Sequence, residues 1–274
     1  MMIQPKISIV MPAWNAERYL TDALESVFNQ TYPNFELLVC DGGSTDSTLE
    51  IFKGVSDVRL KIVSQSDKGL PDALNKGFSF ASGDIYCWLN SDDVYLSADA
   101  IKSAVHEFVS EGSTDFLLGL CATLTEEGSV SRYLLPWVTR SPFAYQGYSN
   151  VFTGALFFRA TTWRQFGGFD PQFGLAFEYQ LLRFLFSSGA IGRVSSSVAY
   201  AGFRQRPDSL SGANADKMRA QLAAILGGKF NPSMNMSEKI ARVIGHMRDG
   251  QLQQFLTLSK MNKALPRPWR SVFY

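Results

Sequence analysis

Short apolar runs alternate with amphipathic stretches over the first 120 residues of the chain. The runs are rich in β-branched and aromatic residues, which is typical of buried strands. They cover Ile7–Met11, Phe35–Cys40, Val58–Val63, Ile85–Leu89 and Phe116–Leu120. Between them, apolar residues recur at helical spacing, which predicts helices over Glu17–Asn29, Ser47–Lys53, Pro71–Phe80 and Ala98–Val109. This alternation predicts an α/β fold with a mostly parallel central sheet and helices on both faces.

The pattern becomes mixed after residue 121. It predicts a hairpin, a strand, a helix, an extended segment and a further helix, over Leu124–Pro136, Val151–Arg159, Ala176–Phe186, Ala190–Phe203 and Asn214–Leu226. We therefore divide the chain into a main domain over 1–228, with halves 1–120 and 121–228, and a helical tail over 229–274. The tail carries eight basic residues against two acidic ones. Two placements fit it: on an anionic membrane surface, or packed on the body or on a second subunit as a homodimer contact.

Composition excludes several classes of protein. The 274 residues are 46% hydrophobic, which is enough to build a core and excludes disorder. A formal net charge of +1 lacks the basic excess expected of a nucleic-acid binder. Three scattered cysteines predict neither a disulfide framework nor a zinc site. The sequence shows no secretory signal and no segment long enough to span a membrane. We therefore expect a cytoplasmic protein, with attachment to a membrane surface as the alternative.

Polar clusters follow four of the predicted strands. They are Trp14-Asn15, Asp41-Gly42-Gly43, Asp67-Lys68-Gly69 and Asn90-Ser91-Asp92-Asp93. Ligands of open α/β sheets bind beyond the carboxyl ends of the strands. Four clusters in succession therefore predict a single ligand-binding edge.

Each cluster has a second interpretation when it is taken alone. Asp92 and Asp93 together suit a hard divalent cation such as Mg²⁺ or Mn²⁺, but either could instead cap the following helix. Asp41 could accept a hydrogen bond from a nucleobase or ribose, or could simply hold its own loop as an Asx turn. Lys68 could reach a diphosphate or lie on a solvated turn.

Longer segments narrow these alternatives. The chain reads SIVMPAWNAERYLTDALESVFNQTYPNFELLVCDGGSTDST, then DKGLPDALNKGFSFASGDIYCWLNSDD, then FTGALFFRATTWRQFGGFDPQFGLAFEYQLLRF and YAGFRQRPDSLSG. In these segments the chain resembles the inverting family 2 glycosyltransferases, which have the GT-A fold. It is similar to the bacterial members that build surface polysaccharides. The resemblance covers roughly residues 5–212 and leaves the basic tail outside.

The resemblance implies a role for each strand-end cluster. It implies a nucleotide pocket lined by Pro12, Ala13 and Glu17 with Trp14 beside them, with Lys68 near the base or diphosphate. It implies that Asp41 hydrogen-bonds the base, most simply the N3–H of uracil.

The same resemblance implies a metal site after the fourth strand. Asp92 would be the principal ligand of Mg²⁺ or Mn²⁺ in the Asp-x-Asp motif, with Asp93 as its neighbour. Asn90 stands where the family has the first Asp, so its amide oxygen would bind the cation without contributing charge.

The resemblance also places a catalytic base after the Gly-Gly-Phe-Asp loop, where Glu178 is the only carboxylate of the matching stretch. A partly apolar setting would raise its pKa and make it a better base. The alternatives are a surface glutamate early in a helix and Asp170 as the base. Arg204 and Arg206 could hold a diphosphate or acceptor, or could face solvent.

We therefore expect an inverting glycosyltransferase that moves a sugar from a nucleotide donor, most simply a UDP-sugar, to a hydroxyl of a glycan or lipid-linked acceptor. A non-catalytic nucleotide-sugar or glycan-binding protein on the same scaffold is the alternative. A nucleotidyltransferase is disfavoured, because MPAWNAERYL has no glycine-rich loop after the first strand.

Overall fold

One ten-stranded mixed sheet organises the part of the chain that the structure, a computed structural model, describes: residues 4–110, 112–134, 136, 152–206, 214–225 and 267–268. Its first half is parallel, in the order β3-β2-β1-β4. These strands are β1 (Ile7–Ala13), β2 (Phe35–Asp41), β3 (Leu60–Ser64) and β4 (Ile85–Trp88). The parallel strands end at a common edge, as the alternation of strands and helices predicts.

The second half of the sheet is mixed. Strand β8 (Leu156–Arg159) lies antiparallel between β4 and β6 (Phe116–Leu124), so the predicted fifth strand is not a direct neighbour of the fourth. β6 also pairs in parallel with the long β9 (Gly192–Arg204) and antiparallel with β7 (Ser129–Leu134). The short strands β5 (Val94–Tyr95) and β10 (Arg267–Pro268) pair with β9 and β7.

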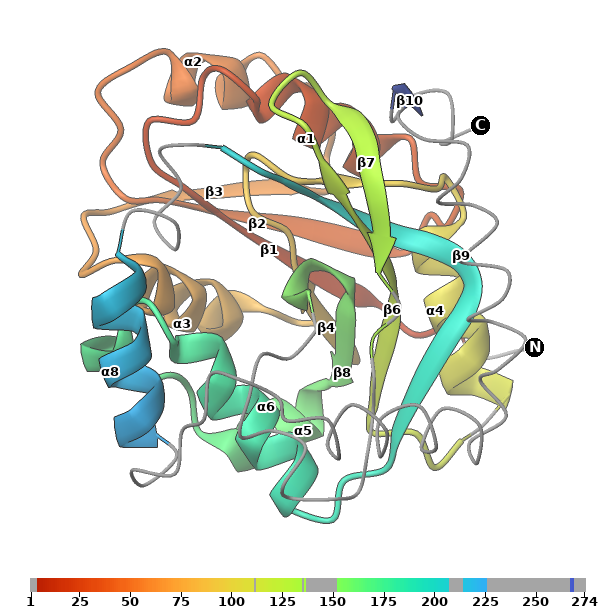
Figure 1. Cartoon of the computed structure of the whole chain (residues 1–274). Helices are drawn as coiled ribbons and strands as arrows, with labels where there is room; N and C mark the ends of the chain where they lie inside the picture. The colour runs from red at the N-terminus through yellow and green to blue at the C-terminus, as the bar shows by residue number, and fades with distance from the viewer. Residues whose placement is uncertain are drawn as a thin grey trace.

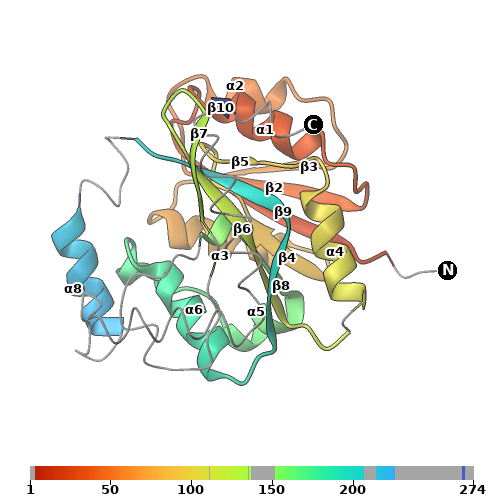
Figure 2. The same cartoon turned by 45° about the vertical axis from the view of Figure 1, so that its right-hand side comes forward.

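Helices cover both faces of this sheet (Figures 1 and 2). On one face, α1 (Leu20–Phe28), α2 (Thr48–Lys53) and α4 (Ala100–Ser110) enclose the larger core. On the other face, α3 (Leu70–Phe80), α5 (Ala160–Phe166) and α6 (Phe177–Ser187) enclose an aromatic core around Phe78 and Trp163. Helix α8 (Ala215–Ile225) contacts α6. Within the described residues, no helix is both long and apolar enough to cross a bilayer.

Several predicted boundaries are wrong by a few residues. β3 begins at Leu60 rather than Val58, because Asp57 folds back to accept hydrogen bonds from the Arg59 backbone N–H and guanidinium. The strand predicted from Val151 begins at Leu156, since a 3₁₀ turn, η2 (Thr153–Ala155), precedes it. The predicted tail lies outside the described residues except for β10.

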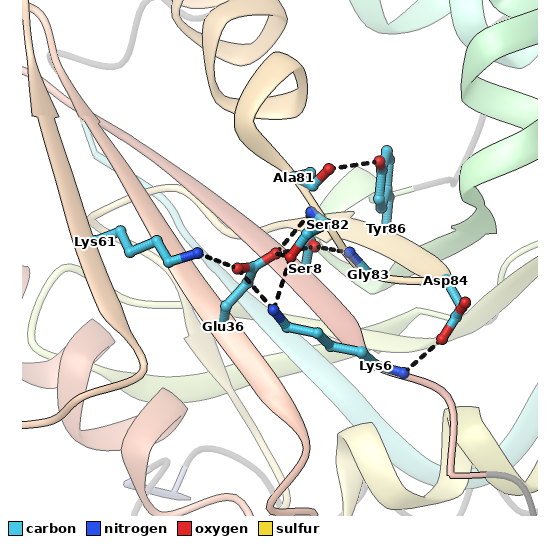
Figure 3. Close-up of polar contacts among 9 residues, drawn as sticks. All are labelled: Lys6, Ser8, Glu36, Lys61, Ala81, Ser82, Gly83, Asp84 and Tyr86. Atoms are coloured by element: carbon cyan, nitrogen blue, oxygen red, sulfur yellow. Dashed lines mark hydrogen bonds and ion pairs between the residues drawn. The ribbon is translucent and has the colours of Figure 1, made fainter.

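A buried carboxylate joins three elements at the edge of the sheet where β1 and β2 begin (Figure 3). Glu36 of β2 accepts hydrogen bonds from Lys6 and Lys61, at 3.0 and 2.8 Å, and from Ser8 at 2.7 Å. Its other contacts are the backbone N–H and hydroxyl of Ser82, in the loop between α3 and β4. Burial would raise the pKa of Glu36, but these hydrogen bonds outweigh it and hold the pKa well below its usual range.

Candidate functional site

The last residues of three parallel strands lie side by side at one edge of the sheet. The register pairs Ala13 of β1 with Asp41 of β2, and Asp41 with Ser64 of β3. β4 flanks β1 on its other side, with Val10 paired to Trp88. The four polar clusters predicted to share an edge therefore follow strands that end together, and the predicted pocket residues Pro12 and Ala13 lie at its centre.

Asp41 shapes the loop that follows β2. Its buried carboxylate accepts a hydrogen bond from the Gly43 N–H at 3.1 Å, longer bonds from the Ser44 N–H, and a 2.8 Å bond from the Ser64 hydroxyl. A Cβ at Gly42 would lie 2.7 Å from an Asp67 carboxylate oxygen, so a larger residue there would require the Asp67 side chain to shift. The Asx-turn interpretation of Asp41 is therefore present in the structure, and base recognition stays a prediction.

The loops after β1 and β2 are held together by side chains. The Asn15 side-chain oxygen accepts from the Thr45 N–H at 2.9 Å, and the Glu17 carboxylate accepts from the Ser47 N–H at 2.9 Å. Glu17 thus supports the wall of the site by joining two loops. Trp14 is 69% exposed, which leaves its indole accessible to a ligand, and Lys68 is also exposed on the loop after β3.

The segment after β4 separates the two adjacent carboxylates. Asp93 is fully buried, and its oxygens accept from the Arg204 backbone N–H at 3.0 Å and the Asn90 amide at 2.9 Å. Desolvation, followed by the nearby Asp92 charge, raises the pKa of Asp93 well above its usual range. Asp92 is instead partly exposed. The predicted pair of metal ligands is therefore unequal: Asp92 faces outward, whereas Asp93 orients Asn90.

Two arginines at the end of β9 surround this segment. Arg204 is 1% exposed and donates to the backbone carbonyls of Asp92 and Glu126, at 3.0 and 2.8 Å. Arg206 makes an ion pair with the Asp92 carboxylate at 2.8 Å. The guanidinium carbons of both arginines lie near the Tyr19 ring, at 4.6 and 5.5 Å from its centre. From the sequence, Arg204 is expected either to bind a ligand or to face solvent, and neither expectation includes burial inside the protein. The sequence FRQR does not indicate which groups its arginines contact.

Glu178 lies in the second half of the main domain, residues 121–228. It lies in the first turn of α6, is partly buried, and accepts a hydrogen bond from the Thr153 hydroxyl. Desolvation raises the pKa of Glu178, and the Thr153 hydrogen bond offsets part of that rise. The β4–β8 register pairs Ile85 with Arg159. The 3₁₀ turn η2, which carries Thr153, contacts β4, the strand that leads to Asn90 and Asp92.

Asp170, the alternative base, stabilises the loop in which it lies. One carboxylate oxygen accepts from the Gln172 N–H at 3.0 Å and so caps a 3₁₀ turn, and the other contacts the Gln172 side chain. The loop that carries Asp170 is fixed by Asn75 of α3, which bonds both the N–H and the carbonyl of Phe169, at 2.9 and 2.8 Å. The Asp170 carboxylate is therefore used within its own loop, and the choice of Glu178 as the base stays a prediction.

The residues after β4 suit a divalent cation that also binds a diphosphate. The Asn90 side-chain oxygen is buried and, among the described residues, has no hydrogen-bond donor. No group of three or more His, Cys, Asp or Glu in the described part of the chain could hold a metal by itself. Mg²⁺ is commonly held by one or two carboxylates together with substrate phosphates. Asp92 would supply the carboxylate of that arrangement, and the Asn90 side-chain oxygen would add a neutral ligand.

The sheet order and the likeness to a solved glycosyltransferase-fold structure define an α/β protein with the GT-A fold. The model of the family described as Glycosyl transferase family 2 matches residues 8–166, more than half of the chain. The chain therefore belongs to glycosyltransferase family 2.

Curated relatives match part of the chain. Chondroitin synthase of Pasteurella multocida is 29% identical over 181 residues, which are 65% of this chain and 18% of that protein. The Escherichia coli UDP-Glc:alpha-D-GlcNAc-diphosphoundecaprenol beta-1,3-glucosyltransferase WfgD is 32% identical over 131 residues, 47% of this chain and 51% of that protein. The chain thus spans less than a fifth of one of these relatives and about half of the other.

Solved structures share the fold. Staphylococcus aureus TarS 1-349 in complex with UDP-GlcNAc has a TM-score of 0.65 at 22% identity, covering 85% of this chain and 69% of that one. Glucosyl-3-phosphoglycerate synthase from Mycobacterium tuberculosis, in complex with Mn²⁺, UDP and phosphoglyceric acid, has a TM-score of 0.57 at 22% identity, covering 81% and 79%. Both likenesses support the GT-A fold predicted from the sequence.

Proposed function

We propose that this chain is an inverting glycosyltransferase that uses a nucleotide sugar, most simply a UDP-sugar, and transfers the sugar to a hydroxyl of a glycan or lipid-linked acceptor. The observation that carries the proposal is the hydrogen bond that Glu178 accepts from Thr153, because Thr153 belongs to η2, which contacts β4, the strand that leads to Asn90 and Asp92. Relatives and structural neighbours named for UDP-sugars support this donor class.

The donor would bind along the strand ends. Pro12 and Ala13 provide an apolar floor, and the exposed Trp14 ring provides a stacking surface for the nucleotide. Asp41 would accept the base N–H in addition to its own loop contacts, because a carboxylate oxygen can accept more than one hydrogen bond. Lys68, exposed after β3, would approach the base or the diphosphate.

Asn90 and Asp92 would hold Mg²⁺ or Mn²⁺ together with diphosphate oxygens. A cation bound there would supply positive charge that stabilises the departing nucleoside diphosphate. Asp93 keeps the Asn90 amide nitrogen engaged, which turns the unpartnered Asn90 oxygen toward a ligand.

Glu178 would remove the proton of the acceptor hydroxyl as that oxygen attacks the anomeric carbon on the face opposite the leaving diphosphate. A positioned general base contributes about 10²–10⁴-fold to the rate. The raised pKa of Glu178 brings the carboxylate closer to the pH at which proton removal is efficient.

The test is a panel of nucleotide sugars incubated with the purified chain and Mn²⁺, with and without glycan or lipid-linked acceptors. We expect release of nucleoside diphosphate for one donor, and loss of about 10²–10⁴-fold in Glu178→Gln. Glu50→Gln, an exposed glutamate of α2, is the matched control and should keep full activity. Donor binding without turnover in the unmodified chain would favour a non-catalytic binding protein instead, and full activity in Glu178→Gln would exclude Glu178 as the base.

A further inference from the structure

The cation site described above already contains a positive charge supplied by the protein. The Arg206 guanidinium lies 2.8 Å from the Asp92 carboxylate, and about a quarter of each side chain is exposed, 24% and 22%. Asp92 is the outward-facing carboxylate of the segment after β4, because both oxygens of Asp93 are used inside the protein. A divalent cation and Arg206 therefore require the same carboxylate.

The position of Arg206 is fixed by its neighbour two residues earlier. Arg204 is anchored through its backbone N–H to Asp93 and through its guanidinium to the Asp92 carbonyl and the Asp22 carboxylate, at 3.0, 3.0 and 2.9 Å. The end of β9 is thus attached to the segment that carries Asp92. Arg206 reaches the carboxylate from this anchored strand end, so the ion pair is a built feature of the fold.

We propose that Arg206 is an internal counter-ion that holds Asp92 while no donor is present and competes with the divalent cation for it. When a nucleoside diphosphate is bound, its phosphate oxygens offer the guanidinium a planar, two-point partner. Arg206 then leaves Asp92 to the cation. This inference rests on the proposed function for the identity of the diphosphate ligand, but the competition itself exists without any donor.

The competition makes the cation and the diphosphate bind cooperatively. Mn²⁺ alone must displace the Arg206 guanidinium from Asp92. When UDP is also bound, its phosphate groups become a second partner for that guanidinium. The tightening of Mn²⁺ binding by UDP must equal the tightening of UDP binding by Mn²⁺. Removal of Arg206 should strengthen binding of Mn²⁺ alone and weaken this coupling.

The experiment measures Mn²⁺ binding to the full chain by calorimetry and by the electron paramagnetic resonance signal of free Mn²⁺, with and without UDP. In Arg206→Gln, we expect Mn²⁺ alone to bind about two- to fivefold tighter, the range expected when a partly exposed ion pair no longer competes. The factor by which UDP tightens Mn²⁺ binding should fall by a similar amount. Arg164→Gln, which removes an exposed positive charge from α5, is the matched control and should change neither value.

Two further variants keep the proposal testable. Arg206→Lys retains the positive charge, so its affinity for Mn²⁺ alone should stay near that of the unmodified chain even if Arg206→Gln folds poorly. In chains that also carry Asp92→Asn, the Mn²⁺ affinity should be the same with Arg206 as with Arg206→Gln. Unchanged Mn²⁺ affinity and unchanged UDP coupling in folded Arg206→Gln would overturn the inference. Altered Mn²⁺ affinity in a chain that turns over no nucleotide sugar would instead overturn the proposed function alone.

Discussion

Replacement of Glu36 with glutamine tests how strongly the charged cluster of Figure 3 stabilises the fold. The Glu36 side chain is 3% exposed, and one of its oxygens accepts from both Lys6 and Lys61. In Glu36→Gln, an amide NH₂ in that position would face two ammonium groups, whereas the amide oxygen could still accept from Ser8 and Ser82. Two charge-assisted hydrogen bonds are therefore lost.

The magnitude follows from the exposure of the two lysines. A hydrogen bond to a buried charge contributes about 1.5–3 kcal/mol, but the Lys6 and Lys61 side chains are 34% and 55% exposed and regain water. We expect Glu36→Gln to lower the free energy of unfolding by about 2–3 kcal/mol at pH 7. For a chain of this size, that corresponds to a fall in Tm of about 4–12 °C.

The assay is urea unfolding followed by circular dichroism between pH 7 and pH 3. Because the pKa of Glu36 is lowered in the folded state, its stabilisation is complete above the unfolded pKa of about 4.3 and is lost as the pH falls below it. The difference in the free energy of unfolding between the unmodified chain and Glu36→Gln should therefore become smaller between pH 5 and pH 3. Glu50→Gln is the exposed control and should stay within about 0.5 kcal/mol. A Glu36→Gln effect no larger than this control, or a difference that does not narrow, would refute the reasoning.

Three other perturbations have defined outcomes. Thr153→Val should shift the acidic limb of the pH–rate profile upward, since loss of the hydrogen bond leaves desolvation of Glu178 unopposed, whereas Thr153→Ser should restore it. An unshifted limb would show that Thr153 does not act on the base. Arg204→Met should lower the free energy of unfolding by about 3–5 kcal/mol in urea titrations, because it leaves buried acceptors unpaired; a loss below 1 kcal/mol would contradict the anchoring role. The three thiols should resist Ellman's reagent until urea is added, since burial raises their pKa values to about 11 for Cys40 and about 12 for Cys87 and Cys121.

The parallel half of the sheet could be predicted from the sequence because its strands are buried on both faces. Continuous apolar runs such as Ile7–Met11 have few other interpretations, and their alternation with amphipathic helices predicts that the strands run parallel. The position of β8 in the sheet, between β4 and β6, could not be predicted from such sequence patterns. Strand pairing over long sequence separations depends on tertiary contacts, and nothing in LFFR indicates that it lies between β4 and β6.

The candidate site, like the sheet, could be predicted only in part from the sequence. The strand-end clusters, including Asp41 and Asp92, could be located because local order along the chain places them at one edge. The different environments of Asp92 and Asp93 could not, because burial of Asp93 depends on β9, more than 100 residues away. Thr153 carries no sequence signal at all, since its partnership with Glu178 arises only when η2 packs beside α6.

The pair of hydrogen bonds between Asn75 and the Phe169 backbone has a consequence for protein engineering. These two hydrogen bonds join α3, in the first half of the main domain, to the Gly-Gly-Phe-Asp loop that leads into α6. A chimaera that exchanges the second half of this chain for that of a relative with another acceptor preference would break this clamp unless the grafted loop presents the same backbone to Asn75. Such swaps should therefore be designed with α3 and the loop transferred as one unit.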